Sequence, residues 1–152
     1  NLSLFYFWPS NSLGHEDNSQ WPKLKAARGK IIALECSPVQ FKFSQLEKGF
    51  WAANWHQNPN IVLQDLWDGP SLNKKQEVIQ HLIQDSVNIQ SDKLILNHIS
   101  ATNGRLGFPD VYAEYLNQYT KVFWKKKSGV KGIQIYDFIT PDLAREIFML
   151  NH

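Results

Sequence analysis

The sequence predicts an α/β fold, in which four strand–helix units form one half of an eight-stranded parallel barrel. The first observation is that short apolar runs, each bounded by polar residues or glycine, recur along the chain. Runs of this kind suit strands that are covered on both faces. The second observation is that amphipathic helical patterns follow the last three runs. Strands and helices in alternation imply a parallel sheet with right-handed crossovers.

The four predicted strands share one pattern, since each turns polar at its C-terminal end. They comprise residues 31–34, 61–65, 94–97 and 133–137. Because the C-terminal ends of barrel strands hold the chemistry, Asp137 is a better catalytic candidate than an acid on a surface helix. Ile133 and Ile135 share its face by the two-residue alternation of a strand. All three therefore point together, either inward to the core and site or outward to the helices.

Three helices are predicted from apolar residues at spacings of three and four. Two of them cover residues 71–87 and 110–123, and a third begins at Thr140-Pro141, a good N-cap and first-turn pair. Residues 35–60 are less regular, and we expect their aromatic side chains to pack a long loop.

Composition limits the classes of function. Of 152 residues, 43% are hydrophobic and 13% aromatic, which is enough for a packed core. A formal charge of +2 is too weak to drive nucleic-acid binding, so no nucleic-acid partner is expected. No stretch approaches the roughly 20 apolar residues that span a bilayer. Cys36 is the only cysteine, so neither an internal disulfide nor a thiolate metal site can form.

Nothing in the sequence marks a linker, which predicts a single domain over residues 1–152. Four units make only half of a barrel, and a free half exposes two parallel edges that natural proteins normally cover or pair. The chain also begins at Asn1 rather than Met. We therefore expect either the other half of the barrel upstream or a second chain that pairs with this one.

Several sequence blocks occur in the order and spacing of a known family. They are Ala27–Ile32, Asn60–Asp65, Leu96-Asn97 with the loop Ser100–Gly104, Tyr112–Asn117 and Gly132–Phe138. Together they span about residues 20–150, and the ordered set is more specific than any block alone. In these blocks the chain resembles the C-terminal half of the bacterial phosphatidylinositol-specific phospholipase C family, an X-domain type of TIM barrel.

The resemblance implies a mechanism in which the inositol 2-hydroxyl attacks phosphorus and expels diacylglycerol. The cyclic phosphate formed can then be hydrolysed. In the family two histidines act as general base and acid, an arginine or a calcium ion stabilises the phosphate, and an acid on the last strand orients the base. The histidines and the basic residue belong to the first half of the barrel. The chain alone is thus expected to be inactive and to bring no cofactor, with calcium left open for the missing half.

The resemblance also assigns candidate site residues. Asp137 matches the acid on the last strand, and Asp65 matches the position that binds inositol hydroxyls. Trp67 stands where the family has a tyrosine against the sugar ring, and a Trp face can stack in the same way. From the residues alone, Asp65 could instead cap the loop before the next helix, and Trp67 could belong to the core.

Two further positions have alternative interpretations. Alternation along the strand puts Asn97 and His98 on opposite faces, so an inward His98 is a candidate binding residue, while a satisfied core or interface histidine is the alternative. Leu106 and Phe108 match the family's membrane-contacting rim, or else their loop closes on a buried Phe. No histidine has partners at metal-ligand spacing, so no metal site is predicted.

The resemblance predicts a phosphoric diester hydrolase or lyase whose partners are a phosphoinositide or related lipid head group and, transiently, a membrane surface. It also implies a secreted protein. Glu35-Cys36 stands where the family has a basic pair, which puts the usual head-group selectivity in question. Two alternatives are a non-catalytic module that binds a head group or sugar phosphate, and a subunit that pairs with a partner half barrel.

Overall fold

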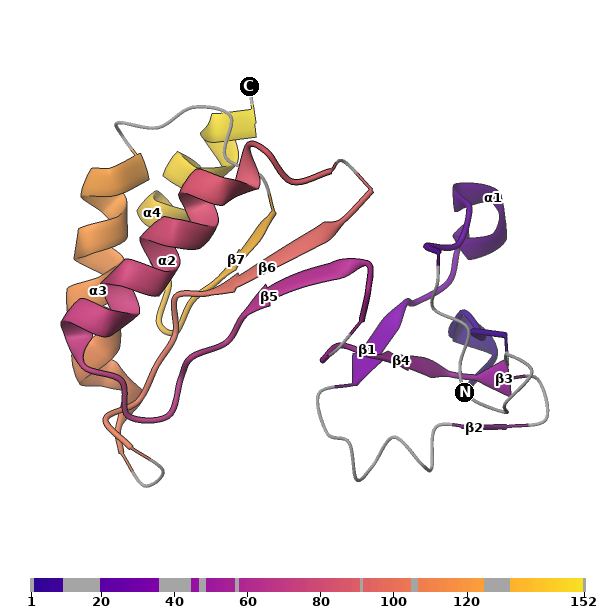
Figure 1. Cartoon of the computed structure of the whole chain (residues 1–152). Coiled ribbons are helices and arrows are strands. Elements are labelled where there is room, and N and C mark those ends of the chain that lie inside the picture. The colour runs from indigo at the N-terminus through magenta and orange to yellow at the C-terminus, as the bar shows by residue number, and fades with distance from the viewer. Residues whose placement is uncertain are drawn as a thin grey trace. The chain divides into compact units, whose positions relative to one another are not determined.

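The computed structural model describes residues 2–9, 20–35, 45–46, 49–56, 58–90, 92–104, 107–124 and 132–151. Its internal contacts divide the chain into two compact units, Asn1–Val62 and Leu63–His152. Figure 1 labels the elements of both units. The prediction of a single domain over residues 1–152 stays a prediction.

The first unit contains short strands and little helix. A 3-10 turn, Leu2–Leu4, and α1, Leu24–Ala27, precede β1, Ala33–Glu35. Strand β1 pairs in parallel with β4, Ala52–Asn54, with Ala33 opposite Ala52. Strands β2, Gln45–Leu46, and β3, Gly49–Phe50, form an antiparallel pair.

Aromatic side chains form the core of this unit. Trp8, Phe50 and Ala53 are buried together, and Tyr6, Trp21 and Leu34 pack against them. The backbones of Trp8 and Phe50 exchange two hydrogen bonds, of 2.7 and 2.8 Å. Phe50 therefore packs as expected, but the expected long loop contains strand β4. The apolar pattern missed β4 because its buried residues are alanines, which fit closely against β1 without large side chains.

The second unit is a three-stranded sheet with helices on one face (Figure 1). Its order is β5-β6-β7, and the strands are Ile61–Gln64, Leu94–His98 and Ile133–Ile135, of which β5 crosses the division between the units. Strands β6 and β7 are parallel, with Asn97 opposite Gln134. The helices are α2, Leu72–Ser86, α3, Pro109–Trp124, and α4, Pro141–Phe148, which a 3-10 turn, Met149–Asn151, follows. Parallel strands alternating with helices confirm the predicted α/β class.

The three predicted helices are confirmed, two of them to within one residue at each end. The Ser71 hydroxyl accepts a hydrogen bond from the Lys74 amide at 3.2 Å and caps α2. The Thr140 hydroxyl caps α4 through the Leu143 amide at 3.3 Å. Among the helices that the structure describes, none has the length and apolarity to cross a membrane.

The core of the second unit lies between the sheet and its helices. Its buried residues are Ile79, Ile83, Ile99, Ala101, Leu116, Trp124 and Leu143. Tyr136, directly after β7, packs against this cluster, and its hydroxyl accepts a hydrogen bond from the Trp124 indole at 2.7 Å. The side chain of Tyr136 therefore faces the helices, which fixes the orientation of its neighbours along β7.

Candidate functional site

One amide side chain from each strand lies on the helix-covered face of the sheet. Gln64 donates to the Asn97 side-chain oxygen at 2.8 Å, and Asn97 donates to the Gln134 side-chain oxygen at 3.0 Å. We call Gln64, Asn97 and Gln134 the amide ladder. Asn97 has no exposed surface. A buried polar network of this kind stabilises one arrangement only when its members are paired, as these are.

Lys75 of α2 extends the amide ladder. Its ammonium donates to the Leu66 carbonyl at 2.6 Å and to the Gln64 side-chain oxygen at 3.3 Å. Lys75 has no exposed surface. Burial lowers the pKa of its ammonium to about 8, although the negative charges of Asp65 and Asp137 act in the opposite direction.

We infer from alternation that the three predicted polar site residues point to the other face of the sheet. Successive strand residues point to opposite faces, so the residues beside Gln64, Asn97 and Tyr136 point away from the helices. These neighbours are Asp65, His98 and Asp137, each of them half-buried. Of the two directions open to Asp137, the structure therefore favours the one toward the barrel interior.

The electrostatics also connect these three side chains. Burial lowers the pKa of the His98 imidazole and the positive charge of Lys75 lowers it further, whereas the charges of Asp65 and Asp137 raise it. The net direction is downward, so the ring is neutral near pH 7 and can donate one hydrogen bond and accept another. Its Nδ1 atom lies 3.4 Å from the Ser100 hydroxyl, and the tautomer decides which group donates.

The backbone that carries Asp137 is held from α3. The Asn117 side chain donates to the carbonyl oxygens of Asp137, at 3.0 Å, and Phe138, at 3.3 Å. Phe138 has a φ of 50°, a left-handed conformation that non-glycine residues rarely adopt. Asn117 thus holds the backbone of a strained turn after β7, from which the Asp137 side chain extends.

A hollow of about 430 Å³ lies beside Asp65. Leu63, Trp67, Asp68 and Val78 are among the residues that line it. Trp67 is 48% exposed, so it is not a core residue. Its carbonyl oxygen accepts a hydrogen bond from the Thr102 amide at 2.9 Å, which ties the loop after β5 to the loop after β6. The N-cap of α2 is Ser71, and the alternative that Asp65 caps the loop before this helix stays a prediction.

Exposed apolar side chains occupy the loops that follow the three strands. Phe108 is 72% exposed, which is inconsistent with a loop that closes on a buried Phe. Leu106, its predicted partner at the rim, lies outside the described residues. Phe138 and Ile139 after β7 and Leu66 after β5 are also exposed, and sequence reasoning had not assigned them to the rim.

Sequence reasoning also missed Lys75, because a Lys-Lys pair early in a helix usually points to solvent. A signal existed in the helical spacing, since Lys75 falls on the same stripe of α2 as the buried Ile79 and Ile83. Lys74 is the exposed member of the pair and forms an ion pair with Glu77 at 2.9 Å.

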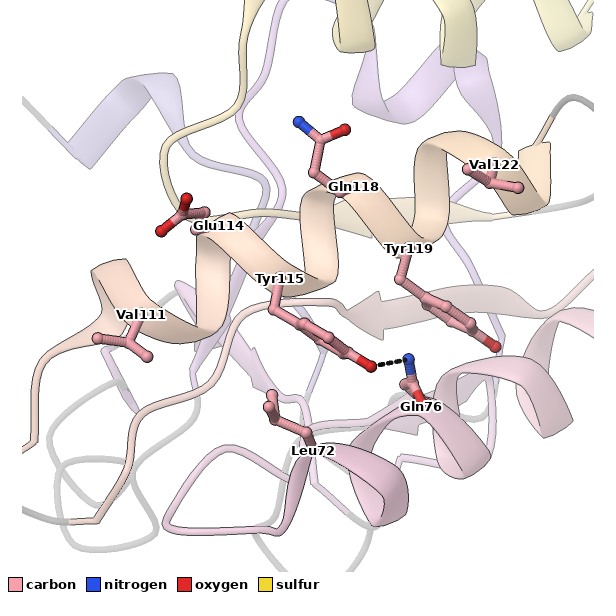
Figure 2. A pocket seen from close by; sticks show the side chains of 8 residues that line it. All are labelled: Leu72, Gln76, Val111, Glu114, Tyr115, Gln118, Tyr119 and Val122. Atoms are coloured by element: carbon pink, nitrogen blue, oxygen red, sulfur yellow. Dashed lines mark hydrogen bonds between the residues drawn. The ribbon is translucent and has the colours of Figure 1, made fainter.

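Other candidates lie apart from this face of the sheet. A hollow of about 640 Å³ lies between α2 and α3, and Figure 2 shows Tyr115 and Tyr119 pointing from α3 toward Gln76 of α2. Its lining side chains include the exposed Val111 and Val122 and none of the predicted site residues. Within the described residues, no group of three or more His, Cys, Asp or Glu side chains could hold a metal ion.

Glu35 and Cys36, which stand where the family has a basic pair, belong to the first unit. Burial raises the pKa of the Glu35 carboxyl, and Cys36 lies outside the described residues. His56 belongs to the same unit. None of these residues is placed relative to Asp65, His98 and Asp137.

No family model matches the chain. The curated 1-phosphatidylinositol phosphodiesterase of Listeria monocytogenes serovar 1/2a (strain ATCC BAA-679 / EGD-e) is 34% identical over 161 residues, which cover 99% of this chain and 47% of that protein. The solved phosphatidylinositol-specific phospholipase C from Listeria monocytogenes has a TM-score of 0.76 at 28% identity, over 99% of this chain and 53% of its own. The chain is similar to bacterial phosphatidylinositol-specific phospholipase C.

The predicted resemblance to that phospholipase C is thus confirmed. A structure of phosphatidylinositol-specific phospholipase C from Staphylococcus aureus, 20% identical with a TM-score of 0.62, shares the fold over 99% of this chain and 53% of its own. The chain spans about half the length of the relatives that it matches, which is consistent with a C-terminal half of the phospholipase barrel.

Proposed function

We propose that this chain is the C-terminal half of a phosphodiesterase that cleaves phosphatidylinositol, and that it supplies the part of the site that holds the inositol head group. One observation carries the proposal. Asp65 directly follows β5, His98 is the last residue of β6, and Asp137 lies two residues after β7, so all three stand at the carboxyl ends of neighbouring strands, where a barrel has its active site. The Listeria relative, a phosphatidylinositol phosphodiesterase by name, supports the substrate class.

In the proposed reaction the inositol 2-hydroxyl attacks phosphorus. A new phosphorus–oxygen bond closes the cyclic phosphate, while the bond to the diacylglycerol oxygen breaks. A general base takes the hydroxyl proton, and a general acid gives a proton to the departing oxygen. Both histidines would come from the other half of the barrel. Positioned proton transfers of this kind contribute roughly 10²–10⁴-fold each.

Asp137 would serve this reaction by orienting the base. A carboxylate at the end of an inward strand can accept a hydrogen bond from an imidazole N–H, which fixes the tautomer and stabilises the imidazolium that forms. The hydrogen bond from Asn117 to the Asp137 carbonyl oxygen would hold the backbone from which this carboxylate extends.

Asp65, His98 and Trp67 would bind the head group. Inositol presents hydroxyls that can donate to the Asp65 carboxylate, and hydrogen bonds to a charged acceptor are the strong ones. The neutral His98 ring can donate to or accept from a further hydroxyl, and the exposed face of Trp67 can stack on the ring.

The exposed apolar rim, Leu66, Trp67, Phe108, Phe138 and Ile139, would touch the membrane that holds the substrate. We also propose that the first step, which forms the cyclic phosphate without water, is a lyase reaction and that the protein is secreted. The resemblance alone supports these two points.

One observation favours a second candidate function. The candidate head-group residues all lie within this chain, so the second candidate is a non-catalytic module that binds a head group through Asp65 and Asp137.

An assay on the full-length natural protein separates the two functions. It is incubated with vesicles of phosphatidylinositol and, as the control, of phosphatidylcholine, and water-soluble phosphates are followed by phosphorus NMR. Release of inositol cyclic phosphate from phosphatidylinositol alone is the expected result. Binding of inositol 1-phosphate without any release would contradict the enzyme and support the module.

A further inference from the structure

The geometry points to Lys75 as a positioning residue, which holds the carboxyl ends of β5 and β6 so that Asp65 and His98 meet the same ligand. This inference rests on the proposed function, because it concerns the same head-group site.

The first step is the contact between Lys75 and β5. Its ammonium binds the Leu66 carbonyl at 2.6 Å, and Leu66 is the residue directly after Asp65. The ammonium also binds the Gln64 side-chain oxygen at 3.3 Å, and Gln64 is the residue directly before Asp65. A single cation therefore holds the chain on both sides of Asp65.

The second step leads from β5 to β6. The Gln64 side-chain nitrogen donates to the His98 carbonyl at 2.7 Å and to the Asn97 side chain at 2.8 Å. The Gln64 side-chain oxygen accepts from Lys75 at 3.3 Å and from the Leu66 amide at 2.9 Å, so the Gln64 amide cannot turn over without losing these bonds. Lys75, which also binds the Leu66 carbonyl, thereby supports the orientation of Gln64 that reaches the backbone of His98.

The third step concerns the charge. A leucine or methionine at this buried position would pack without the desolvation cost of an ammonium. The structure instead keeps a cation whose charge acts on His98, with Asp65 and Asp137 acting on the cation from the strand ends. Lys75 thus connects the three candidate site residues although it lies on the helix side of the sheet.

The chain offers a matched pair of variants. Lys75→Met removes the buried ammonium while keeping a side chain of similar length, and Lys74→Met removes the same charge from the exposed neighbour that pairs with Glu77. Both are made in the full-length natural protein. Binding of inositol 1-phosphate is measured by calorimetry, and the His98 ring is followed by NMR as a function of pH.

We expect Lys75→Met to weaken binding of inositol 1-phosphate by roughly tenfold or more, since small misplacements of positioned groups are costly. The His98 pKa should rise, because the positive charge that lowers it is gone. A purely packing role for Lys75 would not move the His98 pKa. Lys74→Met should leave both the affinity and the His98 titration unchanged.

Unchanged affinity and an unchanged His98 titration in a folded Lys75→Met protein would overturn the inference. If that variant does not fold, Gln64→Met decides, because it cuts the link between Lys75 and His98 while Lys75 keeps its bond to Leu66. Normal binding by Gln64→Met would then refute the positioning role. If the wild-type protein binds no inositol 1-phosphate, the proposed function fails, whereas the His98 titration still tests the action of Lys75.

Discussion

At the scale of single residues, the position of one carboxylate depends on a side chain in another element. Asp137 lies two residues after β7, and the following residue, Phe138, has a left-handed backbone with a φ of 50°. Asn117 of α3 binds both of their carbonyl oxygens. A backbone conformation of this kind costs of order 1–3 kcal/mol, and the two hydrogen bonds from Asn117 offset part of that cost.

Replacing Asp137 tests its proposed role. In the full-length natural protein, we expect Asp137→Asn to lower turnover of phosphatidylinositol roughly 10²–10⁴-fold, because an amide does not hold the base in the required tautomer or stabilise its charged form. The thermal midpoint should hardly change. Asp142→Asn, an exposed acid in the first turn of α4, is the control. Normal turnover by Asp137→Asn would refute the catalytic role, and an unfolded variant would make Asp137 a structural residue.

Lys75 predicts a specific dependence of stability on pH. Its pKa is lowered from 10.5 to about 8 in the folded protein, so between these values the unfolded chain binds more protons at this residue. The contribution of Lys75 to the free energy of unfolding therefore increases as the pH rises through this window, by up to about 3 kcal/mol. Urea unfolding between pH 7 and 10.5 should show this rise in the wild type relative to Lys75→Met. Parallel curves for the two proteins would show that Lys75 is not buried as described.

At the scale of elements, the approach of β6 to the start of β7 depends on one glycine. Gly132 has a φ of 95°, and a Cβ atom there would lie 2.6 Å from the Ile95 Cβ and 2.7 Å from the Ile95 carbonyl oxygen. Only glycine both adopts this positive φ readily and has no Cβ atom to clash with Ile95. This close contact brings the parallel strands together, and with them His98 and Asp137.

Gly132→Ala should therefore destabilise the fold by about 2–4 kcal/mol, since backbone strain and a steric clash add up. Gly104→Ala is the matched control, because Gly104 has a φ of 121° with nothing within 4 Å of an added Cβ. We expect the control to lose only the strain, about 1–2 kcal/mol. Urea unfolding measures both variants, and equal losses would contradict the close approach at Gly132.

The elements also show how far sequence reasoning reaches. The helices were predicted nearly to the residue because caps and apolar periodicity agree, as at Ser71. Strand β4 was missed because alanines give no apolar signal. Alternation predicted that Asn97 and His98 face opposite ways, but the direction of each could be assigned only once the helices were placed over Asn97. The burial of Lys75 depends on contacts between α2 and the end of β5, and the residue pattern within the helix does not reveal these contacts.

At the scale of the whole molecule, the helices that the structure describes in the second unit lie on one face of its sheet. Ile133, at the start of β7 on the face away from the helices, is 52% exposed. In a complete barrel such side chains fill a packed interior. The proposal of a half barrel therefore predicts that this face is covered by another part of a larger assembly.

The isolated 152-residue chain should accordingly not behave as a stable monomer, because open strand edges and apolar interior side chains favour association. Sedimentation equilibrium and urea unfolding together test this expectation. Self-association, or unfolding without cooperativity, is the expected result. A compact monomer that unfolds cooperatively would argue against the half barrel.

The most direct test of the central claim is phosphorus NMR of phosphatidylinositol vesicles with the highly purified chain, alone and combined with the part of the Listeria relative that the chain does not cover. We predict no inositol cyclic phosphate above background from the chain alone, since the general base and acid are missing. Release should appear once the complementary half is added. Robust turnover by the chain alone, or none with the complementary half bound, would contradict the claim that this chain supplies the head-group half of a phosphodiesterase.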